Sequence, residues 1–466
     1  MFNGNKIFRL FILAVLLLGF PTLLILLPQV TSFFNKASGE PANLVIDAGV
    51  DFGQKPGVWK YLAQGGEEQG RMLAPVIEET KALGPRYIRI DHMYDFHNVV
   101  SRDPSGQLAF NFSDLDQTVN DILATGAKPF FSLSYMPKAI SSGTETDNPN
   151  NWSDWEVVVQ RTIEHYSGRS DMNLSDVYYE VWNEPDLFGE YKIGGGKKSY
   201  LDLYLHSSVG AQRARNVNEF KFGGPATTAL YENWVTKLLE FVDKNNLRLD
   251  FYSWHRYSTN LDEFERDIFD ARNWMTYSTT HGNAELLITE IGHNPKVDKG
   301  YDNFFGALHT MATSAVLEDQ IGKSFIFEIK DGPGPEKLWG RWGLLTHEKY
   351  GTPEKKPRYN AIAFLNRMVG SGISTQGLGG WVKAFSKWDH LSNIIRTFVV
   401  NYDPSGHHSE AVPITYNNLP SGNFTFRRID FSGKRSELTV ATSSATWNTI
   451  ELMEPNSATI FEIIPQ

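Results

Sequence analysis

The sequence contains no cysteine. This absence excludes disulfide bonds, thiolate metal sites and a cysteine nucleophile. Positive charge is also scarce, because 44 lysine and arginine residues stand against 54 aspartate and glutamate residues, and the net charge is −10. Binding of nucleic acid requires basic patches. We therefore expect no nucleic acid among the partners of this protein.

Long apolar runs are absent from the sequence except near its start. Residues 10–35 carry no charge, and Lys6 and Arg9 precede them. About 20 apolar residues cross a bilayer, and a positive flank stays in the cytoplasm. We predict a transmembrane helix within residues 1–36, which makes the lipid bilayer a partner and the protein a single-pass protein of the cell membrane with its remainder extracellular. A cleaved signal peptide is the alternative, and it would make the protein secreted.

Strand-like and helix-like segments alternate between residues 37 and 370. One amphipathic segment, Glu67–Leu83, has apolar residues at helical spacing and ends at Gly84-Pro85. Strands that alternate with helices favour a parallel sheet, and eight such units fit a (β/α)8 TIM barrel, with a doubly wound open sheet as the alternative. The predicted strands are Leu44–Ile46, Tyr87–Ile90, Lys128–Ser134, Val177–Trp182, Phe220–Gly223, Leu249–Trp254, Leu286–Thr289 and Lys323–Phe327.

The pattern changes after about residue 370. Gly370–Gly380 is rich in Gly, Ser and Thr and is typical of a linker or long loop. Short strands separated by turns then continue to the end, which favours a C-terminal all-β sandwich over residues 371–466. The predicted organisation is thus a membrane segment at 1–36, a barrel at 37–370 and a sandwich at 371–466.

Two glutamates carry the strongest chemical signal. Glu184 follows the fourth predicted strand in Trp182-Asn183-Glu184-Pro185, and Glu290 lies at the end of the seventh in Thr289-Glu290. The carboxyl ends of barrel strands line the active-site mouth, where strands four and seven oppose each other. Two carboxyl groups about 5–5.5 Å apart suit a retaining glycosidase. A solvated or ion-paired role is the alternative for either glutamate taken alone.

Aromatic residues lie near many of the predicted strand ends. Aromatic faces stack on the C–H surfaces of sugars, although core packing is the usual role of any single one of them. As a set they favour a carbohydrate cleft, and they comprise Trp59, Tyr135, Trp182, Trp254, Tyr257, Trp339 and Trp342.

Trp182-Asn183-Glu184-Pro185, paired with Thr289-Glu290, resembles clan A of the glycoside hydrolases. Within the clan the chain is most similar to family 39, which includes β-xylosidases, α-L-iduronidases and endo-acting hydrolases of bacterial exopolysaccharides. Further support comes from Arg89, Phe251–Tyr257 and Lys356–Ala361, and the likeness covers roughly residues 44–370.

The resemblance implies a role for each matching residue. Glu184 would be the acid/base and Glu290 the nucleophile. Asn183 would bind the sugar 2-hydroxyl, and Arg89 would steady the charge of the nucleophile. His255 and Tyr257 would line the site. The strand-eight pair Phe327-Glu328 departs from the common aromatic platform, which Trp339 or Trp342 could supply.

Two other segments carry weaker signals. Asp91–His97 has the composition of a metal cluster, but no second cluster with ligand spacing accompanies it, so substrate contact or plain loop structure is favoured. Gly194–Ser199 lacks the earlier glycine of a phosphate-binding loop, because position 191 is tyrosine. We therefore expect no metal, cofactor or nucleotide.

These observations together predict a retaining glycoside hydrolase. It would cleave O-glycosidic bonds of a poly- or oligosaccharide by double displacement, either as a β-xylosidase-like enzyme or as an endo-acting enzyme on surface polysaccharide. The alternatives are a non-catalytic carbohydrate-binding protein of the cell surface on the same barrel, and a transglycosylase.

Overall fold

The computed structural model describes residues 39–466 with the exception of residue 421. The predicted membrane segment at 1–36 lies outside these residues. Within the described residues, no helix combines the length and the apolar character that crossing a bilayer requires.

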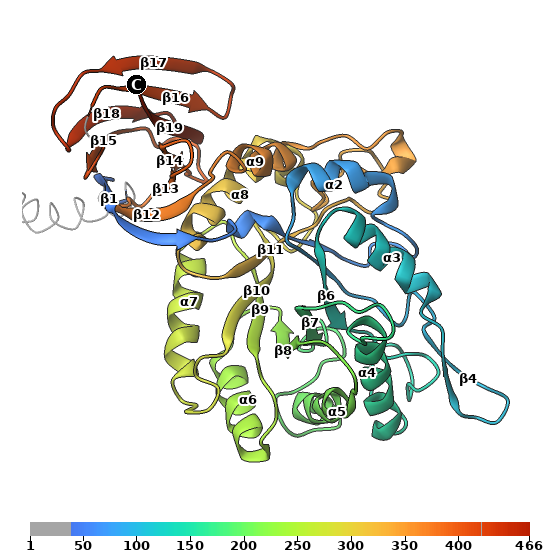
Figure 1. Cartoon of the computed structure of the whole chain (residues 1–466). Helices are drawn as coiled ribbons and strands as arrows, with labels where there is room; N and C mark the ends of the chain where they lie inside the picture. Colours follow the sequence, from blue (N-terminus) through green and yellow to red (C-terminus); the bar gives the residue numbers. More distant parts are fainter. Residues whose placement is uncertain (1–38, 421) are drawn as a thin grey trace, which may run out of the picture.

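Eight parallel strands close into a barrel surrounded by helices (Figure 1). This closure confirms the TIM barrel and excludes the open doubly wound sheet. The barrel strands, in spatial order, are β2 (Tyr61–Gln64), β3 (Tyr87–Ile90), β6 (Lys128–Leu133), β7 (Val177–Val181), β8 (Phe220–Thr227), β9 (Phe251–Tyr257), β10 (Glu285–Gly292) and β11 (Lys323–Phe327). The helices are α2 (Ile77–Leu83), α3 (Ser113–Ala124), α4 (Trp152–Tyr166), α5 (Tyr200–Arg213), α6 (Glu232–Asn245), α7 (Asp262–Met275), α8 (Phe304–Leu317) and α9 (Pro357–Leu365).

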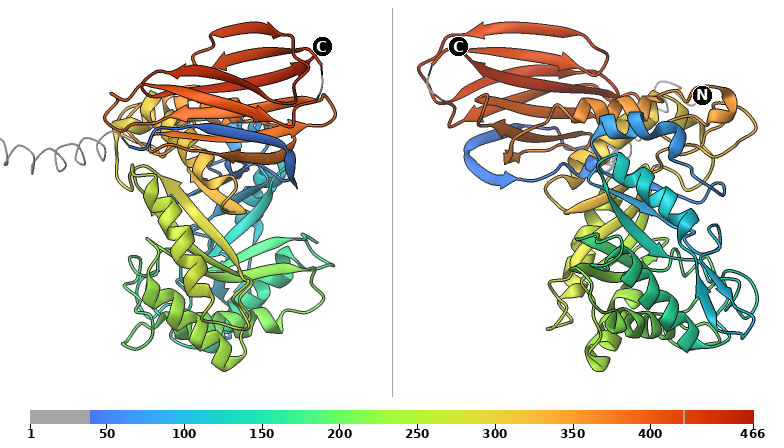
Figure 2. Two further views of the ribbon diagram at one scale, coloured as in Figure 1. Left: turned by 90° about the vertical axis from the view of Figure 1, so that its left-hand side faces the viewer. Right: turned by 45° about the vertical axis from the view of Figure 1, so that its right-hand side comes forward.

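Nine of the remaining strands form an all-β unit beside the barrel, while β4 (Val100–Arg102) and β5 (Leu108–Phe110) pair with each other as a separate two-stranded sheet. Nine strands are hydrogen-bonded in one continuous order that wraps around a single apolar core. We call this unit the sheet domain; its strands are β1 (Leu44–Gln54), β12 (Ser371–Gln376), β13 (Val382–Asp389), β14 (Ile394–Asn401), β15 (Glu410–Asn417), β16 (Phe424–Asp430), β17 (Arg435–Val440), β18 (Trp447–Met453) and β19 (Ser457–Pro465). In both views of Figure 2 this unit lies to one side of the barrel, and its strands β13, β14 and β19 contact α8.

The prediction that Leu44–Ile46 opens the barrel is wrong. These residues belong to β1, which pairs antiparallel with β12 and parallel with β15 in the sheet domain. Leu44 and Ile46 are buried while Val45 is only half-buried, as in a strand with one face on a core. The first barrel strand is instead β2, all four residues of which are buried.

Two further expectations are corrected by the element boundaries. The segment Gly370–Gly380 is not wholly a linker, since β12 lies within it and pairs with β1 and β13. Helix α2 begins only at Ile77, after the 3-10 turn Ala74–Val76 that contains a proline, so Glu67–Arg71 is a loop rather than helix. This loop reaches the mouth of the barrel.

Buried side chains connect the barrel to the sheet domain. The Lys387 ammonium on β13 lies 2.7 Å from a carboxylate oxygen of Glu318, which follows α8. The same glutamate accepts a hydrogen bond from the Val58 backbone N–H over 2.9 Å. Trp59 packs on Phe385 with 5.6 Å between ring centroids. Polar and apolar contacts together therefore fix the sheet domain against the barrel.

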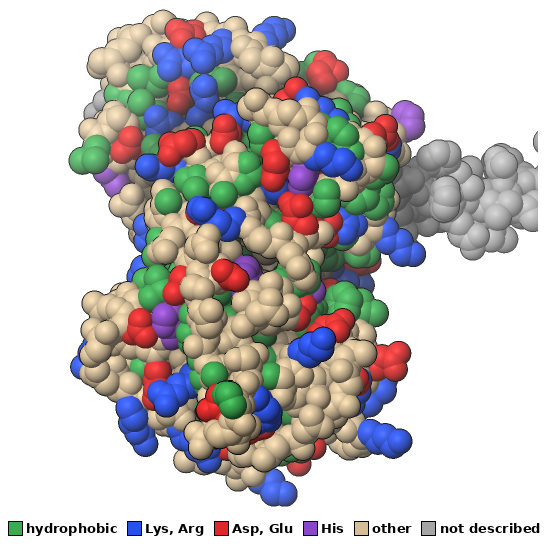
Figure 3. All heavy atoms as spheres, turned by 90° about the vertical axis from the view of Figure 1, so that its right-hand side faces the viewer, with side chains coloured by type: hydrophobic (Ala, Val, Ile, Leu, Met, Phe, Trp, Pro, Cys, Tyr) green, Lys and Arg blue, Asp and Glu red, His purple; other side chains and the backbone are tan. Residues whose placement is uncertain are grey.

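The outer surface carries charges of both signs. Figure 3 shows blue and red side chains interspersed over both lobes of the face in view. No single-sign patch dominates the face in view.

Candidate active site

A cavity of about 590 Å³ lies at the carboxyl ends of the barrel strands. This is the end at which TIM-barrel enzymes carry their active sites. Glu184 and Glu290 both line the cavity, from the loop after β7 and from β10 respectively. The remaining lining residues are Gly65, Gly66, Glu67, Asp91, His92, Tyr135, Asn183, Leu187, Phe188, Thr228, Ala229, Tyr231, Arg256, Tyr257, Pro295, Phe327, Arg341 and Trp342.

The two glutamates are close enough to act on one bond. The Nδ1 atom of His255 lies 2.9 Å from Glu184 Oε1 and 3.5 Å from Glu290 Oε2. Carboxylate oxygens of the two glutamates lie within 4.8 Å of each other. The fold therefore brings together two carboxyl groups that are far apart in the sequence, at the spacing used for double displacement.

Arg89, on β3, is hydrogen-bonded to three side chains beneath the cavity. Its guanidinium donates hydrogen bonds to Glu180 over 2.8 Å, to Glu290 over 3.0 Å and to Asn183 over 2.7 Å. Burial lowers the pKa of Arg89, but the carboxylates of Glu180 and Glu290 outweigh that effect and hold the pKa above its ordinary value. A permanent positive charge thus lies beneath Glu290.

Glu290 receives a second donor from Tyr257. The phenol donates to Glu290 Oε2 over 2.8 Å, while Arg89 binds Oε1. Burial raises the pKa of the Glu290 carboxyl, and the positive charges of His255 and Arg89 oppose that rise. Donors on both oxygens favour the ionised carboxylate.

His255 lies between the two carboxyl groups and is fully buried. Burial lowers its pKa, but the neighbouring charges of Glu290 and Glu184 outweigh this effect, so the pKa stands above its ordinary value. A protonated imidazole at this point reduces the repulsion between the two glutamates.

The backbone around Glu184 is held in an unusual conformation. Trp182 and Glu184 both have positive φ, at 75° and 44°, which side chains other than glycine seldom adopt. The Glu184 N–H donates to the Ala226 carbonyl over 2.9 Å and helps to hold this conformation. Strained backbone of this kind clusters at functional sites.

All of the predicted site residues except Trp339 fall into two groups. Glu184, Glu290, Asn183, Tyr257, Tyr135 and Trp342 line the cavity. Arg89, His255 and Trp182 lie behind that layer, where Trp182 is buried and meets Tyr135 edge-on with 5.2 Å between ring centroids.

Trp339 lies outside the cavity lining, and one face of Trp342 is already covered. The Arg341 guanidinium stacks on the Trp342 ring at 3.4 Å from its centroid. Arg341 also forms a bidentate ion pair with Glu67.

Sequence reasoning missed several lining residues. Glu67 was assigned to a helix, and Leu187, Phe188 and Tyr231 gave no signal as ligand contacts because exposed apolar residues are common in loops. Asp91 and His92 do line the cavity, and one Asp91 oxygen is buried without a hydrogen-bond partner. The adjacent glycines at 65 and 66 are the sequence feature that could have indicated this loop, because two glycines after a strand allow another side chain to approach the backbone closely. In the structure that side chain is His92, whose ring a Cβ on Gly66 would collide with.

Among the residues that the structure describes, two clusters have ligand atoms close enough together to hold a metal ion. In the first, Glu184, His255 and Glu290, the carboxylates are already bonded to a guanidinium, a phenol and an imidazole, and the guanidinium would repel a cation. In the second, Glu68, His347 and Glu348, the buried Lys330 ammonium lies 2.9 Å from Glu68 and 2.6 Å from Glu348. Both donor sets therefore already hold positive charge.

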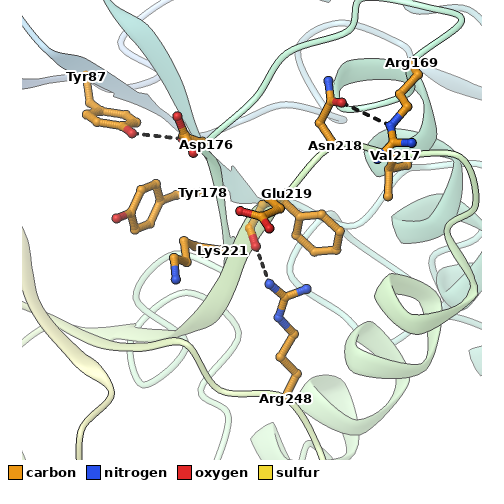
Figure 4. Close-up of a pocket in the computed structure, with 10 residues that line it drawn as sticks. Tyr87, Arg169, Asp176, Tyr178, Val217, Asn218, Glu219, Lys221 and Arg248 are labelled. Carbon is orange, nitrogen blue, oxygen red and sulfur yellow. Dashed lines mark hydrogen bonds between the residues drawn. The ribbon is translucent and has the colours of Figure 1, made fainter.

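A second cavity of about 590 Å³ lies at the opposite end of the barrel (Figure 4). Its lining includes Tyr87 and Phe220, which are the first residues of β3 and β8. In Figure 4 Tyr87 bonds to Asp176, and Arg248 reaches toward the β8 strand. This amino end of a barrel usually serves stability, and the two glutamates lie elsewhere.

The model of the family described as "Glycosyl hydrolases family 39" matches residues 67–307, which is more than half of the chain. The chain belongs to glycosyl hydrolase family 39. This membership confirms the resemblance of the Asn183-Glu184-Pro185 motif and covers all the barrel strands that carry Arg89, Glu184 and Glu290.

Several known proteins are similar to this chain in sequence or in structure. A β-xylosidase of Caldicellulosiruptor saccharolyticus is 32% identical over 322 residues, which are 63% of this chain and 64% of that protein. The match thus spans a little under two thirds of the relative's length.

A GH39 enzyme from Xanthomonas axonopodis pv. citri has a TM-score of 0.73 at 18% identity, over 92% of this chain and 98% of the other. A monomeric β-xylosidase from Caulobacter crescentus CB15 has a TM-score of 0.72 at 19% identity, over 91% and 99%. These two structures share the fold.

Proposed function

We propose that this protein is a retaining glycoside hydrolase that cleaves O-glycosidic bonds by double displacement. The observation that carries the proposal is the approach of Glu184 and Glu290 to within 4.8 Å across the mouth of the barrel. Retention requires one carboxyl group to protonate the leaving oxygen while the other attacks the anomeric carbon. Family membership supports the same chemistry.

Glu290 suits the role of nucleophile. Arg89 and Tyr257 donate to its two oxygens, and both bonds favour the ionised form that attacks carbon. Attack forms a covalent glycosyl–enzyme ester as the bond from the anomeric carbon to the leaving oxygen breaks.

Glu184 suits the role of acid/base. Its carboxyl proton passes to the leaving oxygen, and the resulting carboxylate then removes a proton from water as that water attacks the anomeric carbon. Hydrolysis of the ester returns Glu290 to the ionised form. Glu184 is 14% exposed against 8% for Glu290, so the proposed acid/base is the more accessible of the two to water.

The charge of the cavity favours a neutral sugar at the cleaved bond, as in a β-xylosidase-like enzyme. Three guanidiniums lie in or near the cavity, and each is engaged: Arg89 with Glu180 and Glu290, Arg341 with Glu67, and Arg256 with Asp267. In addition, Asp91 brings a carboxylate oxygen that has no partner. A uronic acid of the kind that α-L-iduronidases accept would thus meet negative charge without a free cation.

The loops on the Glu290 side favour action at chain ends. Arg341 ties the loop after β11 to Glu67 of the loop after β2, and the Trp342 indole donates to the Asn294 carbonyl over 3.1 Å. These contacts hold together the loops that border this side of the cavity. Endo-action on surface polysaccharide is the alternative, and it requires an open groove on both sides.

The test is a panel of aryl β-glycosides and oligosaccharides, with NMR of the first-formed anomer. We expect hydrolysis of a β-xyloside with retention of configuration, and we expect Glu290→Ala to abolish turnover. Glu184→Ala should lose at least about 10²-fold in rate on substrates with poor leaving groups, with rescue by azide. Glu240→Ala, on the exposed face of α6, is the matched control.

Other outcomes discriminate between the alternatives. Binding without hydrolysis across the panel would favour a carbohydrate-binding surface protein. Products longer than the substrate would indicate a transglycosylase, and internal cleavage of long chains would indicate endo-action. Inversion of configuration would contradict the assignment of Glu290 as nucleophile.

A further inference from the structure

Three large apolar side chains remain exposed at one edge of the cavity. Leu187 is 56% exposed, Phe188 42% and Tyr231 38%, and all three line the cavity. We call them the apolar rim. Contiguous exposed apolar surface, unlike apolar residues scattered singly, marks interaction sites and ligand-binding grooves.

The apolar rim is attached directly to Glu184. The backbone N–H groups of Leu187 and Phe188 donate to the Glu184 carbonyl over 3.0 and 2.7 Å, in a tight turn. The position of Leu187 and Phe188 relative to the proposed acid/base is therefore set by backbone hydrogen bonds.

Tyr231 is held to the same turn from the next loop. The Asp186 carboxylate accepts hydrogen bonds from the Thr228 N–H over 3.0 Å and from the Thr228 hydroxyl. The Thr228 hydroxyl in turn lies 3.0 Å from the Tyr231 hydroxyl. This chain of bonds joins the loops after β7 and β8 and orders the apolar rim before any ligand arrives.

The orientation of the substrate in the proposed reaction determines which part of it the apolar rim contacts. The glycosidic oxygen has to meet Glu184, and the anomeric carbon has to meet Glu290. The leaving group therefore extends from Glu184 away from Glu290, on the side where the residues after Glu184 lie. The opposite side carries the ion pair Glu67–Arg341 and Pro295.

We infer that Leu187, Phe188 and Tyr231 form the subsite for the leaving-group sugar, whose apolar C–H face packs on them. This inference rests on the proposed hydrolase function and assigns the side of the cavity at which the released product is bound. Aromatic and aliphatic surfaces bind sugar faces by dispersion and water release, with little demand on hydroxyl orientation. The subsite therefore tolerates varied leaving groups while the polar interior selects the glycone.

The test compares leaving groups of different size on one glycone. Wild-type enzyme, Leu187→Ser and Tyr231→Ala are assayed on β-xylobiose, 4-methylumbelliferyl β-xyloside and β-xylosyl fluoride. The fluoride leaving group is too small to touch the apolar rim. We expect each variant to lose about tenfold in kcat/KM on the two large substrates, which corresponds to about 1.4 kcal/mol, and less than about twofold on the fluoride. Leu438→Ser on β17 and Tyr277→Ala, both at exposed residues outside the cavity lining, are the matched controls.

The possible outcomes distinguish a wrong assignment of the subsite from a wrong assignment of the hydrolase function. Equal losses on all three substrates would indicate damage to the catalytic centre, and unchanged kcat/KM on the large substrates would indicate that the apolar rim does not bind them. Either result would contradict the proposed leaving-group subsite and leave the proposed hydrolase function intact. A wild-type enzyme that hydrolyses neither these xylosides nor the wider glycoside panel would overturn the hydrolase and, with it, the subsite.

Discussion

Tyr257 donates a hydrogen bond of 2.8 Å to Glu290 Oε2. The phenol comes from β9 and the carboxylate from β10, so two adjacent barrel strands fix this contact. It supports the proposed nucleophile without taking part in proton transfer to the leaving group.

Replacing Tyr257 tests that support. Tyr257→Phe removes one hydrogen bond to a charged group, for which a loss of about 1.5–3 kcal/mol is typical. We expect kcat to fall about 10- to 100-fold, and the free energy of unfolding to fall by no more than that same loss. Tyr277→Phe, on an exposed turn, provides the control. An unchanged kcat would mean that Arg89 alone suffices to hold Glu290.

Arg89 should matter for folding as well as for rate. Arg89→Met leaves Glu180 and Glu290 buried without their cation, and breaking a buried ion pair costs about 3–5 kcal/mol. Urea denaturation should show this loss in the free energy of unfolding. Arg161→Met removes an exposed ion pair and should cost less than about 1 kcal/mol. Adding Glu180→Leu to the Arg89 variant should restore part of the stability but none of the activity; the absence of any recovery would contradict the charge argument.

Acid sensitivity should arise from a buried histidine on α8. Burial, aided by His293 and Arg358, lowers the pKa of His309 from 6.5 to about 3. The unfolded chain binds a proton at this residue below pH 6.5 while the folded protein does not, so the free energy of unfolding falls as the pH drops from 6.5 toward 3.

His309→Gln should remove this pH dependence. Between pH 7 and pH 5 the wild type should lose about 2 kcal/mol more than the variant, because each pH unit between the two pKa values contributes about 1.4 kcal/mol. Urea denaturation at both pH values measures the difference. Parallel losses in the two proteins would show that His309 does not carry the effect.

The junction with the sheet domain depends on a buried ion pair. Lys387→Met leaves the Glu318 carboxylate buried beside the Val58 N–H without its cation, and we expect a loss of about 3–5 kcal/mol. Lys387→Met combined with Glu318→Gln should recover part of this loss. Lys128→Met, at an exposed ion pair, should cost less than about 1 kcal/mol. A loss of similar size in that control would argue against burial as the cause.

The barrel and its two glutamates could be predicted because their signals are local. Glu184 and Glu290 each follow a short apolar strand, and parallel strands bring their carboxyl ends to one face. The order of strands along the chain then places residues from β7 and β10 across the mouth.

The first barrel strand could not be predicted in the same way. Leu44–Ile46 and Tyr61–Gln64 are both short apolar runs, and only their tertiary partners distinguish them. The strand β1 finds two neighbours in the sheet domain, whereas β2 closes the barrel between β11 and β3.

The positions of side chains in irregular loops could not be predicted from the sequence either. Glu67 reaches the cavity because Pro75 delays the start of α2, and the apolar spacing of the segment does not reveal this delay. Trp339 and Trp342 are close neighbours in the sequence, yet only Trp342 lines the cavity. Loop conformation depends on contacts such as the ion pair between Glu67 and Arg341, which no periodicity encodes.

Because β1 is held between β12 and β15, the barrel is a chain insertion within the sheet domain rather than a preceding unit. Deleting residues 371–466 would strip β1 of both neighbours and leave Leu44 and Ile46 in water, at the edge of a strand prone to self-association. A minimal barrel therefore has to be cut at both ends, with residues 39–54 removed together with the C-terminal portion. Recombination between relatives by a single crossover near residue 370 would pair one parent's β1 with the other parent's β12 and β15. We therefore expect chimeras to fold better when β1, β12 and β15 come from the same parent.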